Sequence, residues 1–224
     1  GQDERDEASR LLTEADRIFD EALDRAHPEA ATTLMNLGHL ARDARRWDEA
    51  DAFYRRGLAL RRSLLGPTHH SIAASLNNMA FARALSGDAS GAYELYDEAR
   101  RVLETSFPDG HIRTTYQLVQ MGKLRRQQGR YAESAALLRE ALQMRQRVAA
   151  HRPRLVARAR LHLAATLVML GRHRDAERLL DLAEPHISSP EDMDWDVLHR
   201  TFAQVYAETD RPRLAARHEA LRGR

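Results

Sequence analysis

Two adjacent histidines, His69 and His70, and two adjacent asparagines, Asn77 and Asn78, have the side-chain types and spacing that could form a chemical site. Imidazole nitrogens bind metals such as zinc, and side-chain amides both donate and accept hydrogen bonds. A zinc site takes several protein ligands, however, and no third ligand lies close to this histidine pair in the sequence. The sequence also contains no cysteine and no HExxH motif. We therefore expect neither a metal site nor a cofactor.

The sequence shows none of the motifs that usually mark a catalytic site. It contains no glycine-rich phosphate loop and no GxSxG element, and the lack of cysteine excludes a thiol nucleophile. Carboxylate pairs such as Asp48 and Glu49 fall on predicted helix surfaces, where solvent-exposed salt bridges are the usual outcome. We therefore expect that the chain is not an enzyme.

The histidines and asparagines recur along the chain with a period of 42 residues. The period is visible in two columns, with His27, His69 and His111 in the first and Asn36, Asn78, Gln120 and His162 in the second. Equivalent residues of stacked repeats form a row, one repeat apart, and do not converge on a single point. The three histidines are therefore predicted to begin successive repeats rather than to bind one metal ion.

Apolar and small residues follow the same period and predict pairs of helices. Apolar residues at i, i+3, i+4 and i+7 form a stripe along each expected helix. Gly87, Gly129 and Gly171 align between two such stripes, with Arg45 in place of the first glycine, and a glycine there ends a helix in a left-handed cap. One hairpin cannot bury its stripe alone, so neighbouring hairpins must stack. The sequence predicts an all-α solenoid.

The period also divides the chain. Residues 1–26 are expected to form the second helix of a truncated repeat, and residues 191–224 a degenerate C-terminal capping hairpin. Four full repeats lie between them, at residues 27–68, 69–110, 111–152 and 153–190. The whole chain is thus expected to be a single repeat array. Because it begins without methionine, we expect it to be part of a longer polypeptide.

The repeat resembles the tetratricopeptide repeat, and its period is similar to that of the kinesin light chain type. The resemblance is carried by LGPTHHSIAASLNNMA at residues 65–80 and RRWDEADAFYRRGLALRRSLLG at residues 45–66. They are similar to the LGP-x-HP, SLNNLA and GRYEEAE-like segments of that type. His70 stands where the family has proline, Arg45 where it has a turn glycine, and Ala89 where it has an aromatic residue. The resemblance implies a right-handed α-α superhelix whose first helices line a concave, peptide-binding groove.

The resemblance also implies which side chains face the groove. These residues are Asn36, His39, Arg42, Asn77, Asn78, Phe81, Tyr116, Gln120, Lys123, Arg126, Arg158 and His162. Amides suit such a groove because they donate to and accept from the backbone of an extended peptide, and basic neighbours add a preference for carboxylates. The amide and imidazole column has an alternative role, as buried side chains that bond the neighbouring hairpin.

Charge is distributed unevenly along the chain. Residues 112–178 contain 15 lysines and arginines against 4 acidic residues, whereas residues 180–210 contain 1 against 8. A solvated helix surface explains this pattern, and so does attraction of an acidic partner or of another copy of the chain. Nucleic acid is disfavoured as a partner because the only aromatic residues of the basic stretch are Tyr116 and Tyr131, which offer little stacking surface.

Together these patterns predict a protein–protein interaction module that binds a peptide segment or a partner protein in its groove. The resemblance implies that its context is the regulatory or sensor part of a larger bacterial protein. No apolar run reaches the roughly 18 residues of a membrane span, so we expect a cytoplasmic location. The alternative is a structural or oligomerisation scaffold whose groove or ends mediate self-association. A module for an acidic partner or for nucleic acid has less support.

Overall fold

The computed structural model describes residues 28–108, 110–187, 189 and 194–222, and six residues before them, Glu7, Arg10, Leu11, Thr13, Glu14 and Arg17. Every regular element among the described residues is a helix, so the predicted all-α class is confirmed. The helix expected within residues 1–26 lies almost entirely outside the described residues, and so does His27, the first of the periodic histidines.

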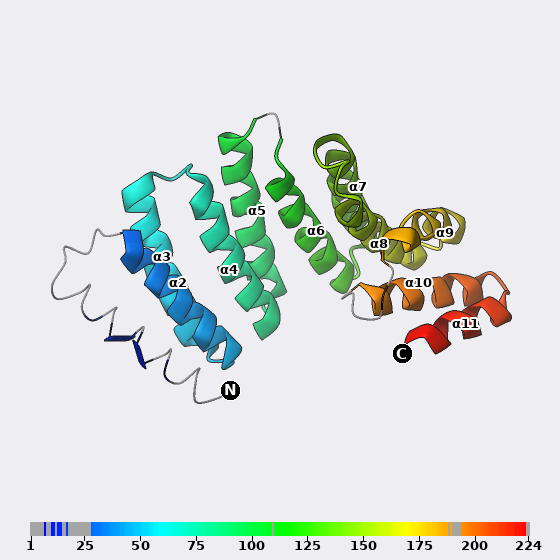
Figure 1. Ribbon diagram of the computed structural model, residues 1–224, viewed down its shortest axis with the longest axis horizontal. Helices are drawn as coiled ribbons and strands as arrows, with labels where there is room; N and C mark the ends of the chain where they lie inside the picture. The colour runs from blue at the N-terminus through cyan, green and yellow to red at the C-terminus, as the bar shows by residue number, and fades with distance from the viewer. Residues whose placement is uncertain are drawn as a thin grey trace. The chain divides into compact units, whose positions relative to one another are not determined.

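The chain forms two units, Gly1–Asp109 and Gly110–Arg224, of which the first contains two described hairpins (Figure 1). The helices of unit 1 are α2 (Pro28–Asp43), α3 (Trp47–Leu65), α4 (His70–Ser86) and α5 (Ala89–Ser106). Helix α2 pairs with α3, and α4 pairs with α5. Helix α4 contacts both α2 and α3, so the second hairpin stacks on the first. The expected single array across both units stays a prediction.

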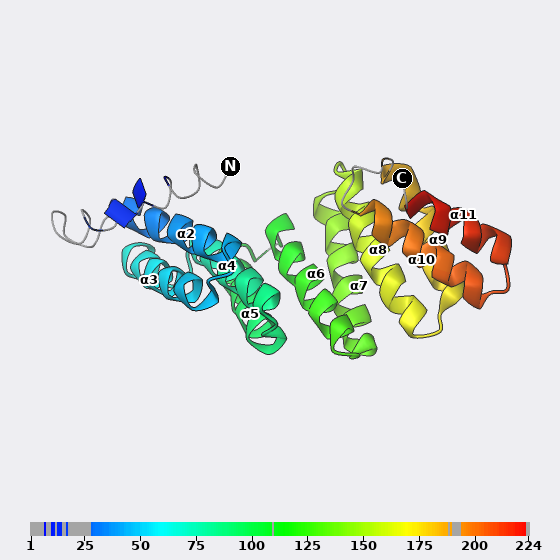
Figure 2. The ribbon, with the colours of Figure 1, turned by 90° about the horizontal axis from the view of Figure 1, so that it is seen from below.

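The described part of unit 2 contains three hairpins (Figure 2). Its elements are α6 (Ile112–Gln127), α7 (Tyr131–Val148), α8 (Pro153–Met169), α9 (His173–Asp181), the short 3-10 helix η1 (Glu184–His186), α10 (Trp195–Glu208) and α11 (Pro212–Arg222). Helices α6 and α7, α8 and α9, and α10 and α11 form the pairs. Helix α8 is central, because it contacts α6, α7, α9 and α10.

One residue of each hairpin turn adopts the left-handed backbone conformation. The backbone angle φ is 94° at Gly87, 74° at Gly129 and 70° at Gly171, the three aligned glycines. Arg45 has a φ of 58° and Asp210 a φ of 56°, although neither is glycine. A left-handed residue stops the first helix and lets the chain reverse into the second. The position in the repeat therefore imposes this conformation even where the residue type does not favour it.

The small residues of the first helices leave room for large side chains of the second helices. A Cβ atom added at Gly38 would lie 2.4 Å from Cε1 of Tyr54, and one at Gly122 would lie 2.7 Å from Cγ of Leu138. Tyr54 and Leu138 are both fully buried. Each unit has its own apolar core, one spanning Met35 to Leu103 and the other Leu118 to Tyr206. Close approach of the paired helices is thus built into the period.

The periodic histidines cap helices. The Nδ1 atom of His69 accepts a hydrogen bond of 3.2 Å from the backbone N–H of Ser71 at the start of α4. Nδ1 of His111 accepts an equivalent bond of 3.0 Å from the N–H of Arg113 at the start of α6. A side chain that accepts from one of the first N–H groups of a helix satisfies a donor that has no partner inside the helix. Both histidines therefore begin their hairpins, as the period predicts.

Candidate partner-binding surfaces

The expected groove residues of unit 1 lie on α2 and α4, two helices that contact each other. We call this group surface 1, and its members are Asn36, His39, Arg42, Asn77, Asn78 and Phe81. Asn36 and Phe81 are exposed, and the other four are half-buried. Phe81 is 40% exposed. The exposed side chains of surface 1 are therefore one amide, that of Asn36, and one aromatic ring, that of Phe81.

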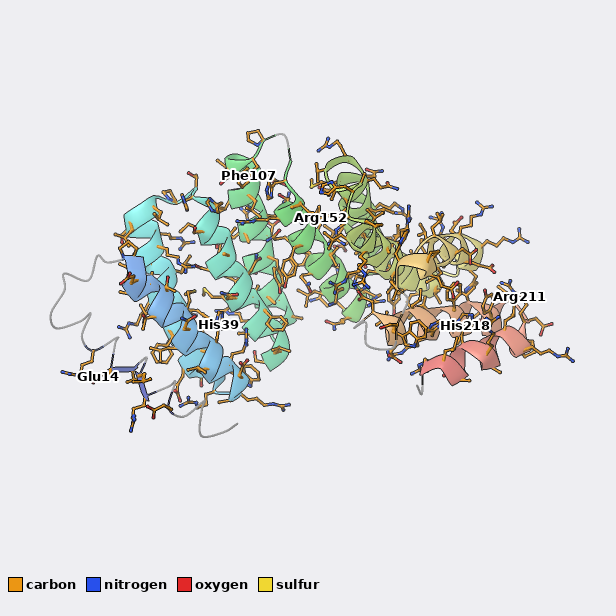
Figure 3. All side chains as sticks on the ribbon, viewed as in Figure 1. Glu14, His39, Phe107, Arg152, Arg211 and His218 are labelled. Atoms are coloured by element: carbon orange, nitrogen blue, oxygen red, sulfur yellow. The ribbon has the colours of Figure 1, made fainter. Side chains whose placement is uncertain are left out.

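Contacts within surface 1 connect its two helices. The guanidinium carbon of Arg42 on α2 lies 5.4 Å from the centre of the Phe81 ring on α4, which is a cation–π distance. His39 on α2 (labelled in Figure 3) has its ring 5.6 Å from that of Tyr54, edge to face. Burial lowers the pKa of His39, as does the charge of Arg42, and a hydrogen bond with Asn78 opposes them. His39 is therefore neutral at pH 7, and Arg42 carries the positive charge of the surface.

The expected groove residues of unit 2 lie on α6 and α8, which also contact each other. This group, surface 2, consists of Tyr116, Gln120, Lys123, Arg126, Arg158 and His162. Tyr116 is exposed, the next four residues are half-buried, and His162 is buried. Surface 2 differs from surface 1 in charge, because three of its six side chains are cations.

Surface 2 holds its cations in a partly desolvated environment. Burial is the main cause that lowers the pKa of Lys123, and the charges of Arg126 and Arg158 lower it further. Burial also lowers the pKa of Arg126. Nε of Arg158 lies 2.5 Å from a carboxylate oxygen of Asp194, which is buried just before α10. Charges that are held together out of water attract anions strongly.

His162 departs from the expectation of an open groove position. Its side chain is buried, and its Nδ1 atom has no hydrogen-bond partner among the described residues. Burial, followed by the charges of Lys123 and Arg126, lowers the pKa of His162 to about 3, so the ring is neutral at pH 7. The column of amide and imidazole residues is thus split: Asn36 is exposed, Asn78 and Gln120 are half-buried, and His162 lies at the base of surface 2.

One functional candidate beneath surface 2 escaped the sequence-based prediction. Arg145 on α7 is only 6% exposed, and its Nε donates to Oγ1 of Thr115 at 3.0 Å. One of its terminal nitrogens donates to the carbonyl oxygen of Leu155 at 2.6 Å. The sequence carried a signal, because the equivalent residue of the preceding repeat is the apolar Leu103. The same column contains Arg61 in the first repeat and the apolar Ile187 in the fourth, so arginine alternates with apolar residues there. An arginine in such a column indicates a charge with specific partners.

The structure offers little for other kinds of site. Within the described residues no group of histidine and acidic side chains could hold a metal ion, and no helix is long and apolar enough to cross a membrane. A small pocket in unit 1 lies between the start of α3 and the end of α4. It is lined by Trp47, Asp48, Asp51, Ala82, Arg83, Ser86 and Asp88. Arg83 bridges Asp51 at 3.3 Å and Asp88 at 3.5 Å there, so its charge is already paired with two of the three carboxylates of the pocket.

Comparisons with known proteins agree with these hairpins. A sequence model of the tetratricopeptide repeat matches residues 29–105 and 113–185. The crystal structure of BtubC (BKLC) from P. vanneervenii is similar with a TM-score of 0.79 and 18% identity, over 99% of this chain and 91% of that one. A kinesin light chain-type protein from Podosopora anserina, with nearly identical repeats, has a TM-score of 0.69 and 16% identity, over 88% of this chain and 95% of that one.

A third similar structure is YrrB, a tetratricopeptide repeat protein with an unusual peptide-binding site. Its TM-score is 0.58 and its identity 14%, over 96% of this chain and 90% of that one. No curated protein sequence matches the chain. At these identities the structures establish the fold, and they confirm the predicted solenoid of tetratricopeptide-like hairpins of the kinesin light chain type.

Proposed function

Because the chain belongs to the tetratricopeptide repeat family, we propose that it is a protein–protein interaction module that binds an extended peptide segment of a partner protein. The observation that carries this proposal is the side-chain pattern of α2. Met35 and Leu37 are buried in the hairpin, whereas Asn36 between them is exposed. Asn36 is thus an exposed amide beside packed residues of α2, and an amide can both donate to and accept from the backbone of a peptide.

The two surfaces fit different parts of a partner. Surface 1 combines amides with the exposed ring of Phe81, which suits a peptide backbone and an apolar side chain. Surface 2 is cationic and suits an acidic partner, since arginine and lysine form charge-assisted hydrogen bonds with carboxylates. No catalytic step is required of either surface. We place this binding role in a regulatory or sensor part of a larger bacterial protein in the cytoplasm.

Selection from a library of displayed peptides tests the proposal. Peptides that bind the wild-type chain should lose about tenfold in affinity in Asn36→Ala, Asn78→Ala or Arg126→Glu, because each removes about one hydrogen bond or ion pair. Glu94→Ala on α5 and Gln143→Ala on α7 serve as controls, because both residues are exposed on second helices. Equal losses in the controls, or a failure to select any peptide, would contradict peptide binding by surfaces 1 and 2.

The alternative is self-association through the same surfaces, which the uneven charge of the chain would favour. Sedimentation equilibrium of the wild type and of Arg126→Glu decides between the two. Under the proposed function both have the mass of a monomer and only peptide affinity changes. A dimer in the wild type that dissociates in Arg126→Glu would identify an oligomerisation scaffold. A nucleic-acid partner would show as a gel shift at low salt that weakens steeply as salt is added.

A further inference from the structure

We propose that surface 2 contains a binding site for a phosphoryl group, formed by Lys123, Arg126 and His162, with Arg145 and Arg158 at its border. The inference deepens the proposed function and rests on it, because the phosphoryl group would be carried by a serine, threonine or tyrosine residue of the bound peptide. The site lies wholly within unit 2.

Helix geometry brings these side chains together. Lys123 and Arg126 are three residues apart on α6, and Arg158 and His162 are four apart on α8, so each pair lies on one face of its helix. Helices α6 and α8 contact each other. The charges of these three basic residues, and that of Arg145 on α7, all lower the pKa of His162, so all four lie near its ring. Three helices therefore supply one cationic cluster, which consists of Lys123, Arg126, Arg145 and Arg158.

The balance of charge in the cluster favours a dianion. Arg158 is paired with Asp194 at 2.5 Å, so the positive charges of the other three cations still have to be balanced. Among the residues that the structure describes, Asp194 is the only acidic one whose charge acts on Lys123 and on Arg145. The charge that acts on Arg126 is that of another cation, Arg200. A carboxylate brings a single negative charge, whereas a phosphoryl group brings about −1.5 to −2 at pH 7 and three acceptor oxygens.

His162 supplies an independent indication of a ligand. Its side chain is 7% exposed, and its Nδ1 has no hydrogen-bond partner among the described residues. Buried polar atoms are nearly always hydrogen-bonded, so an exception calls for an explanation, and beside a cluster of cations an anionic ligand supplies one. The neutral ring carries one N–H group, and the tautomer protonated at Nδ1 can donate to an oxygen. A phosphoryl oxygen at the base of surface 2 would satisfy this atom and the cations together.

Calorimetric titration of the chain with inorganic phosphate and with acetate tests the class of ligand. We expect phosphate to bind at least about tenfold more tightly than acetate at the same ionic strength, because the second charge adds roughly one further charge-assisted interaction. A serine-containing peptide, measured with and without phosphorylation of the serine, then tests whether the phosphoryl group is carried by a peptide. The phosphorylated peptide should bind more tightly than inorganic phosphate alone, since surface 2 also contacts the peptide.

Variants locate the site. Lys123→Gln and Arg126→Gln should each weaken phosphate binding by about tenfold. Arg174→Gln, which removes the same charge from an exposed position on α9, should bind phosphate like the wild type. In the wild type the nitrogen-15 resonance of His162 Nδ1 should shift on phosphate addition, which reports the contact without any substitution. His162→Phe should lose affinity while circular dichroism shows unchanged helicity.

Several outcomes would overturn the inference without touching the proposed function. Equal affinity for acetate and phosphate would make the ligand a carboxylate. An equal effect of Arg174→Gln would reduce the site to general charge attraction. Phosphate binding that is undetectable in the wild type at low ionic strength would show that surface 2 has no site for a phosphoryl group. Loss of peptide binding at surface 1 would contradict the proposed function instead, since no phosphoryl group is involved there.

Discussion

The buried rings of His199 on α10 and His218 on α11 are joined by a hydrogen bond of 2.7 Å between their two Nδ1 atoms. Trp195 lies against His199 with ring centres 4.1 Å apart, and Phe202 stacks on His218 at 4.6 Å (His218 is labelled in Figure 3). One Nδ1 must donate and the other must accept, so at least one ring has to be neutral. The pairing of α10 with α11 therefore depends on the protonation state of two histidines.

Acid should weaken the α10–α11 hairpin. Burial, followed by the charges of His218 and Arg217, lowers the pKa of His199 to about 4, and burial followed by Arg217 lowers the pKa of His218. An unfolded histidine titrates near 6.5, so between that pH and about 4 the unfolded state binds more protons and stability falls as the pH falls. We expect the protonation of His199 in the unfolded state to lower the free energy of unfolding by about 2 kcal/mol between pH 7 and pH 5.

Urea unfolding at pH 7 and pH 5, followed by the fluorescence of Trp195, measures this loss. The chain has two tryptophans, so a Trp47→Phe background leaves Trp195 as the reporter for unit 2. A His199→Phe, His218→Phe variant removes both titrating groups and should show a correspondingly smaller pH dependence, with His162 supplying the remainder. An identical pH dependence in both proteins would show that the histidine pair is not the cause.

Arg145 should stabilise unit 2 through its two buried hydrogen bonds. Arg145→Ala removes the bonds to Thr115 and Leu155 and leaves a cavity, and we expect it to lower the unfolding free energy by about 2–4 kcal/mol. Arg145→Leu keeps much of the apolar volume and matches Leu103 of the preceding repeat, so its loss should be smaller. Gln146→Ala, an exposed neighbour, is the control for urea unfolding. Equal losses in Arg145→Ala and Gln146→Ala would exclude a structural role.

The helix contact at Gly38 should tolerate an added methyl group less well than the one at Gly57. Alanine at Gly38 would meet the rigid, buried ring of Tyr54, whereas alanine at Gly57 would first meet the flexible end of Met35, at 2.5 Å. Overpacking destabilises a protein by about 1–3 kcal/mol, whereas the higher helix propensity of alanine stabilises it by about 1 kcal/mol. Gly38→Ala should therefore be clearly destabilising in urea unfolding, and Gly57→Ala close to neutral. The reverse order would refute the steric explanation.

The period was sufficient to predict the helices and the turns, but not which side chains are buried. His69 and His111 occupy equivalent positions and make equivalent capping bonds, because capping depends on residues close in sequence. Asn36 and His162 occupy equivalent positions too, yet one is exposed and the other buried, because burial depends on neighbours from other helices. The His199–His218 pair lies in the last hairpin, where the spacing departs from the period, so alignment with other repeats could not reveal it.

The turn at Arg45 offers a stabilising substitution that follows from both the period and the structure. Its φ of 58° is unfavourable for any residue with a Cβ atom, and glycine relieves this strain of about 1–2 kcal/mol at some cost in chain entropy. Arg45→Gly should thus raise the unfolding free energy of unit 1 by about 0.5–1 kcal/mol.

The reciprocal change, Gly87→Ala, introduces the strain at a φ of 94° without any steric contact, so it should destabilise. Arg46→Gly, where φ is −86°, is the control and should destabilise as well. Urea unfolding followed by Trp47 fluorescence compares the three, and a gain in Arg46→Gly equal to that in Arg45→Gly would attribute the effect to lost charge instead of relieved strain.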